Sequence, residues 1–175
     1  MQPRERILET AFILFHRQGY NSTGINQIIA DSKVAKASFY QHFKSKEDLC
    51  VEFLNKRHSY WFDQLNLFTS KNKTSKAKVV SSFDFLRFMN ETENYRGCSF
   101  LNILSEIPAD NTKIIEVIQN HKNDLRDYFK RLITDENIAD HIYLLFESAI
   151  IESQLFKNQW SVDKAKAIVN NLIHQ

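Results

Sequence analysis

Apolar residues along this chain recur mainly three and four positions apart, the spacing of residues that share one face of a helix. The pattern begins at residue 4, where Ile7, Ala11 and Phe15 share a face, and Gly19 ends it. Short polar stretches separate further segments with the same spacing. The chain holds only 3 Gly and 2 Pro, too few for the tight turns of a strand-rich protein. The pattern therefore predicts an all-α fold.

About nine helices are expected. Ser22 or Thr23 is available to cap the second of them, and Ser45 is placed to cap the fourth. The predicted helices cover, in order, residues 4–18, 25–30, 34–43, 45–67, 75–92, 98–107, 111–133, 136–157 and 162–173.

The second and third helices are short, and the tight polar break 31–33 joins them behind a longer first helix. This arrangement is typical of a helix-turn-helix, whose second short helix enters the major groove of DNA. Within residues 34–43, Val34, Phe39 and Phe43 are expected to face inward. The polar residues left to face outward, of types that reach phosphates and base edges, are Lys36, Ser38, Tyr40, Gln41 and His42.

Charge is distributed in agreement with this interpretation. The formal net charge is only +2, but residues 1–46 hold seven Lys or Arg and three acids, and no acid lies between Lys33 and Lys46. A basic segment on a nearly neutral body is typical of a small DNA-binding domain, although a solvated lysine face gives the same pattern. We expect a helix-turn-helix DNA-binding domain over residues 1–46 and a helical effector-binding and dimerisation domain over residues 47–175.

The run from Thr23 to Leu49, TGINQIIADSKVAKASFYQHFKSKEDL, resembles the N-terminal domain of the TetR/AcrR family of bacterial transcriptional regulators. The resemblance covers roughly residues 4–54 and implies a symmetric homodimer, a palindromic double-stranded DNA operator and a small-molecule effector. It implies phosphate contacts from Thr23, Tyr40 and Lys46. The other residues that it places at the DNA are Lys33, Ala35, Lys36, Ser38, Gln41 and His42.

Two positions depart from the family pattern. Lys33 stands in the turn where the family usually has Gly, so its φ is expected to be positive. Ala35 stands where Ser or Thr usually caps the recognition helix, and losing such a cap costs about 1 kcal/mol. Both departures concern the geometry of the turn.

The remaining two-thirds of the chain is rich in apolar and aromatic residues. Between residues 138 and 151 the apolar arc is wider than one helix face, which predicts a second partner besides the chain's own core. The predicted dimer interface is Ile142, Leu145, Ala149, Val162, Ala165, Val169 and Leu172. The predicted effector pocket, apolar or aromatic in character, is lined by Trp61, Phe62, Phe83, Phe88, Cys98, Phe100, Tyr128 and Phe146.

Several other function classes find no support in the pattern. The six His and two Cys show no metal-ligand spacing, Cys98 is better explained as a packed residue than as a redox thiol, and no nucleophile elbow or phosphate loop occurs. We therefore expect no enzyme activity, cofactor, metal or membrane segment, and a cytoplasmic location. The predicted function is a repressor released from DNA by its effector. The alternatives are an activator, an effector-independent regulator, or a protein–protein interaction module that no longer binds DNA.

Overall fold

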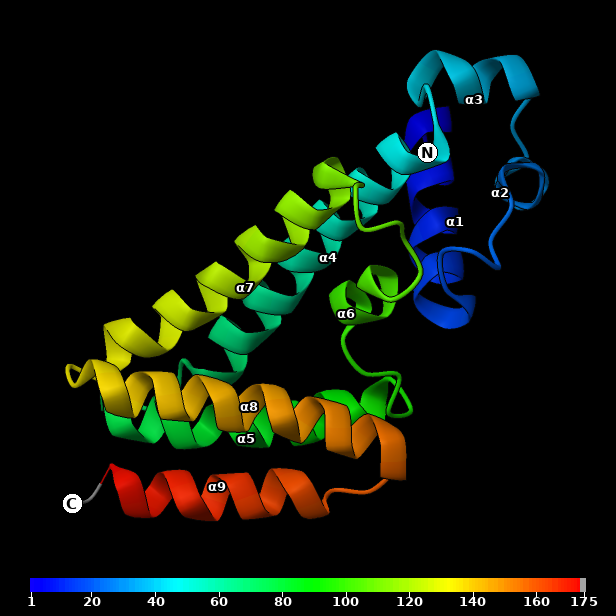
Figure 1. Cartoon of the computed structure of the whole chain (residues 1–175). Coiled ribbons are helices and arrows are strands. Elements are labelled where there is room, and N and C mark those ends of the chain that lie inside the picture. Colours follow the sequence, from blue (N-terminus) through cyan, green and yellow to red (C-terminus); the bar gives the residue numbers. More distant parts are fainter. Residues whose placement is uncertain (174–175) are drawn as a thin grey trace. The chain divides into compact units, whose positions relative to one another are not determined.

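The apolar positions spaced three and four apart do form helices in the computed structural model, which describes residues 1–173 (Figure 1). Within these residues there are nine helices and no strand, so the all-α prediction is confirmed. The helices are α1 (Pro3–Gln18), α2 (Ile25–Ser32), α3 (Lys36–His42), α4 (Lys46–Thr69), α5 (Ser75–Thr92), α6 (Ser99–Leu104), α7 (Thr112–Leu132), α8 (Glu136–Phe156) and α9 (Trp160–Leu172). None of the described helices is both long and apolar enough to cross a membrane.

Every helix end lies within three residues of its predicted position. The Ser45 hydroxyl accepts a hydrogen bond from the backbone N of Asp48 at 3.0 Å, so Ser45 caps α4 as predicted. The predicted cap of α2 is wrong, because Gly24 occupies the N-cap position and offers no side-chain cap hydrogen bond. The hydroxyl of Thr23 instead donates to the carbonyl oxygen of Gly19 at 2.7 Å.

The chain folds into two compact units, and each is described by itself. Unit 1 contains residues 1–60 and 99–120, and unit 2 contains residues 61–98 and the described chain from residue 121 onward. Both α4 and α7 contribute residues to each unit. The boundary that we expected between residues 46 and 47 falls inside unit 1, within the first turn of α4.

Unit 1 is built around the inner face of α1, which packs against α2 and α3. Ile7, Ala11 and Phe15 are buried on this face at intervals of four. Phe15 meets Phe53 of α4 edge to face, with ring centroids 5.5 Å apart. The face that the sequence pattern selected on α1 is therefore the one that anchors the small helices.

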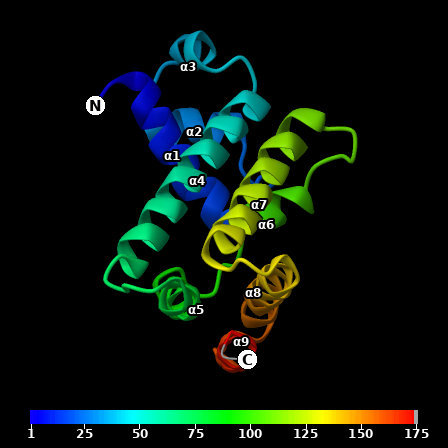
Figure 2. The same ribbon diagram turned by 90° about the vertical axis from the view of Figure 1, so that its left-hand side faces the viewer.

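Unit 2 is held together by α5, α8 and α9, which contact one another and are seen nearly end-on in Figure 2. Phe83, Phe129 and Phe146 are fully buried in its core. The ring of Phe146 lies 5.2 Å from that of Phe83 and 5.5 Å from that of Phe129, between centroids. Aromatic residues of the sequence pattern thus supply the core of this unit.

The predicted dimer interface needs a correction. Its members Ile142, Ala149, Val162, Ala165 and Val169 are buried in the chain's own core, and Leu145 and Leu172 are half-buried. The physical reason is that α8 and α9 pack against each other and against α5, so the stripe of small residues serves contacts within one chain. The residues that we predicted for a dimer interface therefore lie on the inner faces of α8 and α9.

A second apolar stripe lies on the outer surface of α8. Leu144, Ile151 and Leu155 are 61%, 51% and 68% exposed. With the exposed His141 and Ser148 they recur at alternating intervals of three and four, the spacing of a helix–helix contact. We call His141, Leu144, Ser148, Ile151 and Leu155 the outer stripe. The over-wide arc that the sequence showed on this helix therefore has an inner and an outer half.

Candidate nucleic-acid interface

The turn between α2 and α3 is made possible by one left-handed residue. Lys33 has φ 54° and ψ 45°, as expected from its position in the turn. Its backbone N donates to the carbonyl oxygen of Ala30 at 3.1 Å, and the N of Val34 donates to that of Ile29 at 3.3 Å. These bonds end α2 and redirect the chain into α3 within three residues.

The inner side of α3 is fixed by aromatic packing. Phe39 is fully buried and Phe43 nearly so, with ring centroids 6.1 Å apart. The guanidinium of Arg4 lies 5.3 Å from the centroid of the Phe43 ring. The N-cap residue Ala35 bonds to no backbone N–H through its side chain, so the helix is held by packing rather than by its cap.

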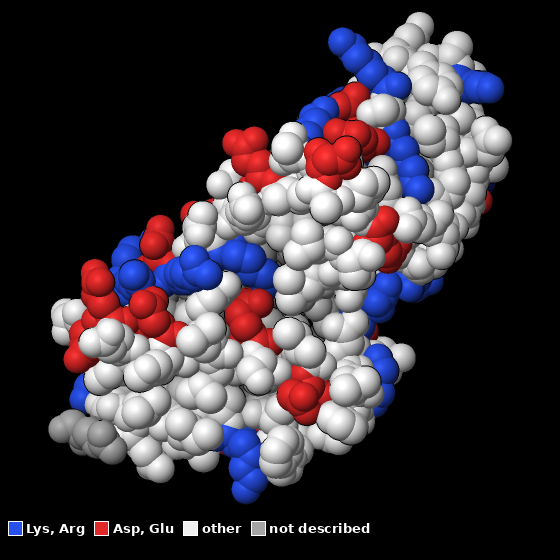
Figure 3. Space-filling model, in the orientation of Figure 1, with Lys and Arg blue, Asp and Glu red and all other residues white. Residues whose placement is uncertain are grey.

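The opposite side of α3 is open to solvent. Lys and Arg side chains, blue in Figure 3, project around the end of unit 1 that carries α3. Ser38 and Lys46 of the predicted DNA-binding set are half-buried. The members that are exposed are Lys33, Ala35, Lys36, Tyr40, Gln41 and His42. The turn, the helix and the residue that begins α4 thus bring eight of the nine predicted residues to or near the surface of unit 1.

Thr23 is the exception. Its side chain is fully buried, and its hydroxyl donates a hydrogen bond to the carbonyl oxygen of Gly19. A buried hydroxyl that already donates its proton cannot reach a phosphate in this conformation, so we remove Thr23 from the proposed DNA contacts. Its position before α2 suggested an exposed cap, but the chain turns this side chain inward.

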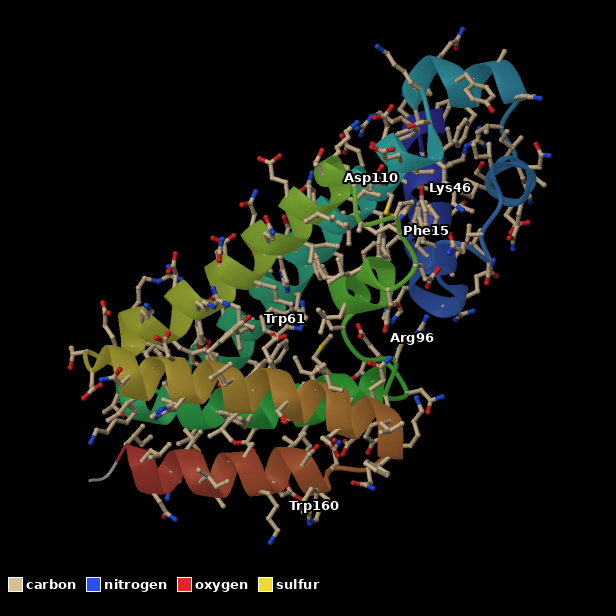
Figure 4. All side chains as sticks on the ribbon, viewed as in Figure 1. Phe15, Lys46, Trp61, Arg96, Asp110 and Trp160 are labelled. Atoms are coloured by element: carbon tan, nitrogen blue, oxygen red, sulfur yellow. The ribbon has the colours of Figure 1, made fainter. Side chains whose placement is uncertain are left out.

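Lys46 begins α4 and lies beside the connector between α1 and α2 (Figure 4). Its Nζ atom is 4.1 Å from the centroid of the Tyr20 ring, within the range of a cation–π interaction. Partial burial lowers the pKa of the Lys46 ammonium from its ordinary value, and this is the largest effect on it. The charge of Lys46 therefore lies at the edge of the candidate interface, against the face of the Tyr20 ring.

Sequence reasoning missed two residues that bear on this surface. Lys44 is exposed between α3 and α4, and its signal was present in the acid-free run from Lys33 to Lys46. Glu106 follows α6 and contacts the connector between α1 and α2, where its carboxylate accepts a hydrogen bond from Asn21. No spacing pattern could have revealed that contact, because 85 residues separate the two.

The residues of the predicted effector pocket are divided between the two units. Phe100 lies in unit 1, and the other seven lie in unit 2. Phe88 was expected in the pocket but is 44% exposed on α5, where it meets only the edge of the aromatic cluster through Phe68. Three surface hollows of unit 2, the largest of about 670 Å³ beside Phe68 and Val80, are lined by other residues.

Comparisons with known proteins agree with this geometry. Residues 7–53, which span α1 to the middle of α4, match the family model described as bacterial regulatory proteins, tetR family. The N-terminal part of the chain is therefore similar to the tetR family of bacterial regulatory proteins. The resemblance inferred from residues 23–49 is confirmed, and the match contains the whole α2–turn–α3 arrangement.

Two curated relatives illustrate how far the sequence likeness extends. The chain is 38% identical over 78 residues to the HTH-type transcriptional regulator QacR of Staphylococcus aureus, which is 45% of this chain and 42% of that protein. It is 48% identical over 58 residues to the HTH-type transcriptional regulator LmrA of Bacillus subtilis, 33% of this chain and 31% of that protein. The chain thus matches less than half the length of either relative.

The fold extends further than the sequence likeness. A TetR-family transcriptional regulator from Streptomyces coelicolor has a crystal structure that superimposes with a TM-score of 0.90. The match covers 98% of this chain and 88% of that one at 22% sequence identity. The helical part that follows the helix-turn-helix therefore has the TetR fold, while its residues have diverged.

Proposed function

We propose that this chain is a DNA-binding transcriptional regulator that uses α3 as its recognition helix. The observation that carries the proposal is the two-sided character of α3: Phe39 and Phe43 anchor it, while Lys36, Tyr40 and Gln41 are exposed. A helix with one polar, uncovered side fits the major groove of DNA, which is about 12 Å wide. The likeness to QacR and LmrA, both HTH-type transcriptional regulators, supports it.

The proposed contacts fall into two groups. Tyr40 and Lys46 lie at the surface with a hydroxyl and an ammonium that suit phosphate oxygens, and phosphate contacts position a protein without reading sequence. Lys36 and Gln41 carry groups that hydrogen-bond to base edges, so they are proposed to select the base pairs. Lys33, Ala35, Ser38 and His42 complete the proposed set around the turn and the end of α3.

The two groups predict different effects on binding. Lys46→Ala and Tyr40→Phe are expected to weaken binding to specific and scrambled duplexes alike. Lys46→Ala also removes a cation at a phosphate, so it should flatten the log–log salt slope by about 0.9, whereas Tyr40→Phe removes an uncharged hydroxyl and should leave the slope unchanged. Gln41→Ala is expected to change which base pair is preferred, by about 1–3 kcal/mol for a good contact. Fluorescence anisotropy across a salt series measures both effects. Unchanged affinity for every duplex in all three variants contradicts the proposed interface.

We also propose that the regulator is a homodimer formed through the outer stripe of α8 together with exposed apolar residues of α9. Trp160 and Ile168 of α9 are 63% and 47% exposed, and the side chain of Trp160 points away from the helix into solvent (Figure 4). Such a concentration of large exposed apolar side chains on two adjoining helices is typical of an interface. A second copy of the chain can cover it symmetrically, since two α8–α9 pairs make a four-helix bundle.

The proposed effector site lies in unit 2, around Trp61. Trp61 and Phe62 of α4 are half-buried, and the Trp61 ring lies 5.2 Å from Phe62, 5.2 Å from Phe85 and 5.9 Å from His121, between centroids. Aromatic edges of this kind suit an apolar or aromatic molecule. Because α4 also carries Lys46 in its first turn, a ligand that displaces Trp61 changes the position of the helix that holds a proposed phosphate contact.

Effector release has a direct test. Apolar and aromatic compounds that raise the melting temperature of the free protein are expected to lower its affinity for the operator. By linkage, such a ligand must bind the DNA-free form more tightly than the DNA-bound form. Trp61→Ala should reduce the thermal shift of the same compounds. Compounds that stabilise the protein and leave operator affinity unchanged refute release, and compounds that increase operator affinity favour an activator.

A further inference from the structure

Glu106 joins the segment after α6 to the connector between α1 and α2 by two hydrogen bonds, both donated by Asn21. Its carboxylate accepts from the backbone N of Asn21 at 2.6 Å. The Nδ2 atom of Asn21 donates to the carbonyl oxygen of Glu106 at 2.8 Å. All of these atoms belong to unit 1, so the contact is internal to one compact unit.

The connector is shaped to receive this carboxylate. Gly19 is buried with φ +93°, a backbone conformation that residues other than glycine rarely adopt. A Cβ atom at Gly19 would overlap the Glu106 carboxylate, so the absence of a side chain leaves the space that the carboxylate fills. A glycine that looked like a simple helix end in the sequence therefore also admits a long-range partner.

The connector in turn supports the candidate interface at two points. It carries Tyr20, whose ring faces the ammonium of Lys46. It also leads into α2 through Thr23, whose hydroxyl donates to Gly19 and whose backbone N donates to the carbonyl oxygen of Tyr20 at 3.2 Å. A change in the connector thus reaches both Lys46 and the beginning of α2.

We propose that Glu106 is a positioning residue for DNA binding: its carboxylate holds the connector so that Tyr20 and the start of α2 keep Lys46 and α3 in place for the duplex. This inference rests on the proposed DNA-binding function. It makes a counter-intuitive prediction, because Glu106 carries a negative charge in the unit that is proposed to bind an anionic polymer. Electrostatics alone predicts that removing the charge strengthens binding to phosphates. Positioning predicts the opposite.

Three variants separate the two effects. Glu106→Ala removes both the charge and the acceptor, whereas Glu106→Gln removes the charge and keeps an oxygen that can accept from Asn21. Asp31→Ala is the matched control, because Asp31 is an exposed acid at the end of α2 and its removal reports the effect of charge. We expect Glu106→Ala to bind the operator at least tenfold more weakly than the parent. Glu106→Gln should bind within about threefold of the parent or more tightly, and Asp31→Ala more tightly.

Two further readouts exclude a general loss of structure. The salt slope of Glu106→Ala should flatten by up to about 0.9, because the contact of Lys46 is lost. Amide hydrogen exchange of Asn21 in the DNA-free protein should accelerate at least tenfold in Glu106→Ala, while amides of the α8 core keep their protection. Restored affinity in Glu106→Gln then assigns the effect to the accepted hydrogen bond.

The outcomes that overturn the inference differ from those that overturn the function. If the parent binds a selected duplex and Glu106→Ala binds it equally or more tightly, Glu106 does not position the interface, and DNA binding stands. Equal loss of affinity in Glu106→Ala and Glu106→Gln also overturns it, because the hydrogen bond would then be irrelevant. If the parent binds no duplex, the proposed function fails first and this inference fails with it.

Discussion

An Ile151→Asp variant is expected to be a folded monomer that binds the operator at least 100-fold more weakly than the parent protein. Ile151 lies in the outer stripe of α8 and is 51% exposed within one chain, so a carboxylate there remains hydrated in the monomer. In the proposed dimer the same carboxylate would be desolvated, which opposes association. A monomer loses the second half-site, and linking two binding modules typically raises affinity by about 10²–10⁴.

Sedimentation equilibrium and anisotropy on the same samples test this expectation. Leu67→Asp is the matched control, because Leu67 is 69% exposed near the end of α4 and does not belong to the outer stripe of α8. The control should remain a dimer and keep its operator affinity. A dimeric Ile151→Asp protein, or a parent that sediments as a monomer at micromolar concentration, contradicts the proposed interface.

An Ala149→Asp variant is expected to lose about 3–5 kcal/mol of unfolding free energy, the typical cost of an unpaired buried charge. Ala149 is 2% exposed, and its carbonyl oxygen accepts a hydrogen bond from the Ser161 hydroxyl at 3.1 Å. Ala149 belongs to a core cluster of buried apolar and aromatic side chains, which carry no charge that could pair with a carboxylate. For a chain of this size the loss corresponds to a fall of about 6–20 °C in the melting temperature.

The neighbouring residue provides the control for this variant. Ser148 is exposed in the outer stripe, so Ser148→Asp should leave the melting temperature of the monomeric protein within a few degrees of its parent. Differential scanning calorimetry in a monomeric Ile151→Asp background separates folding from association. If Ala149→Asp leaves the melting temperature in that background unchanged, Ala149 is not buried in the core, which contradicts the structure.

The spacing of apolar residues three and four positions apart predicted the features that depend on local structure. The helices lie within three residues of their expected ends, and the inward positions Phe39 and Phe43 lie where the pattern placed them. The positive φ of Lys33 was also expected, because the family that residues 23–49 resemble usually has Gly at this position. The helix ends and the inward positions depend on neighbours in the sequence, and a single sequence contains them.

Features that depend on distant partners were not predictable in the same way. The wide apolar arc of α8 indicated two partners, but which half faces the chain's own core depends on α5 and α9. The prediction chose the half that contains Ala149, which the structure buries in the chain's own core. Likewise, Thr23 was expected at the surface, because its inward turn depends on a bond to Gly19 that a position before a helix does not reveal.

The most direct test of DNA recognition by α3 is a selection of duplexes from a random library with the full-length parent protein. The account predicts enrichment of an inverted repeat whose half-site centres lie about 10–10.5 base pairs, or a whole multiple of this, apart. The enriched duplex should bind at least about 10³-fold more tightly than a scrambled one at physiological salt. A library that shows no enriched sequence, or equal affinity for enriched and scrambled duplexes, contradicts sequence-specific recognition by this chain.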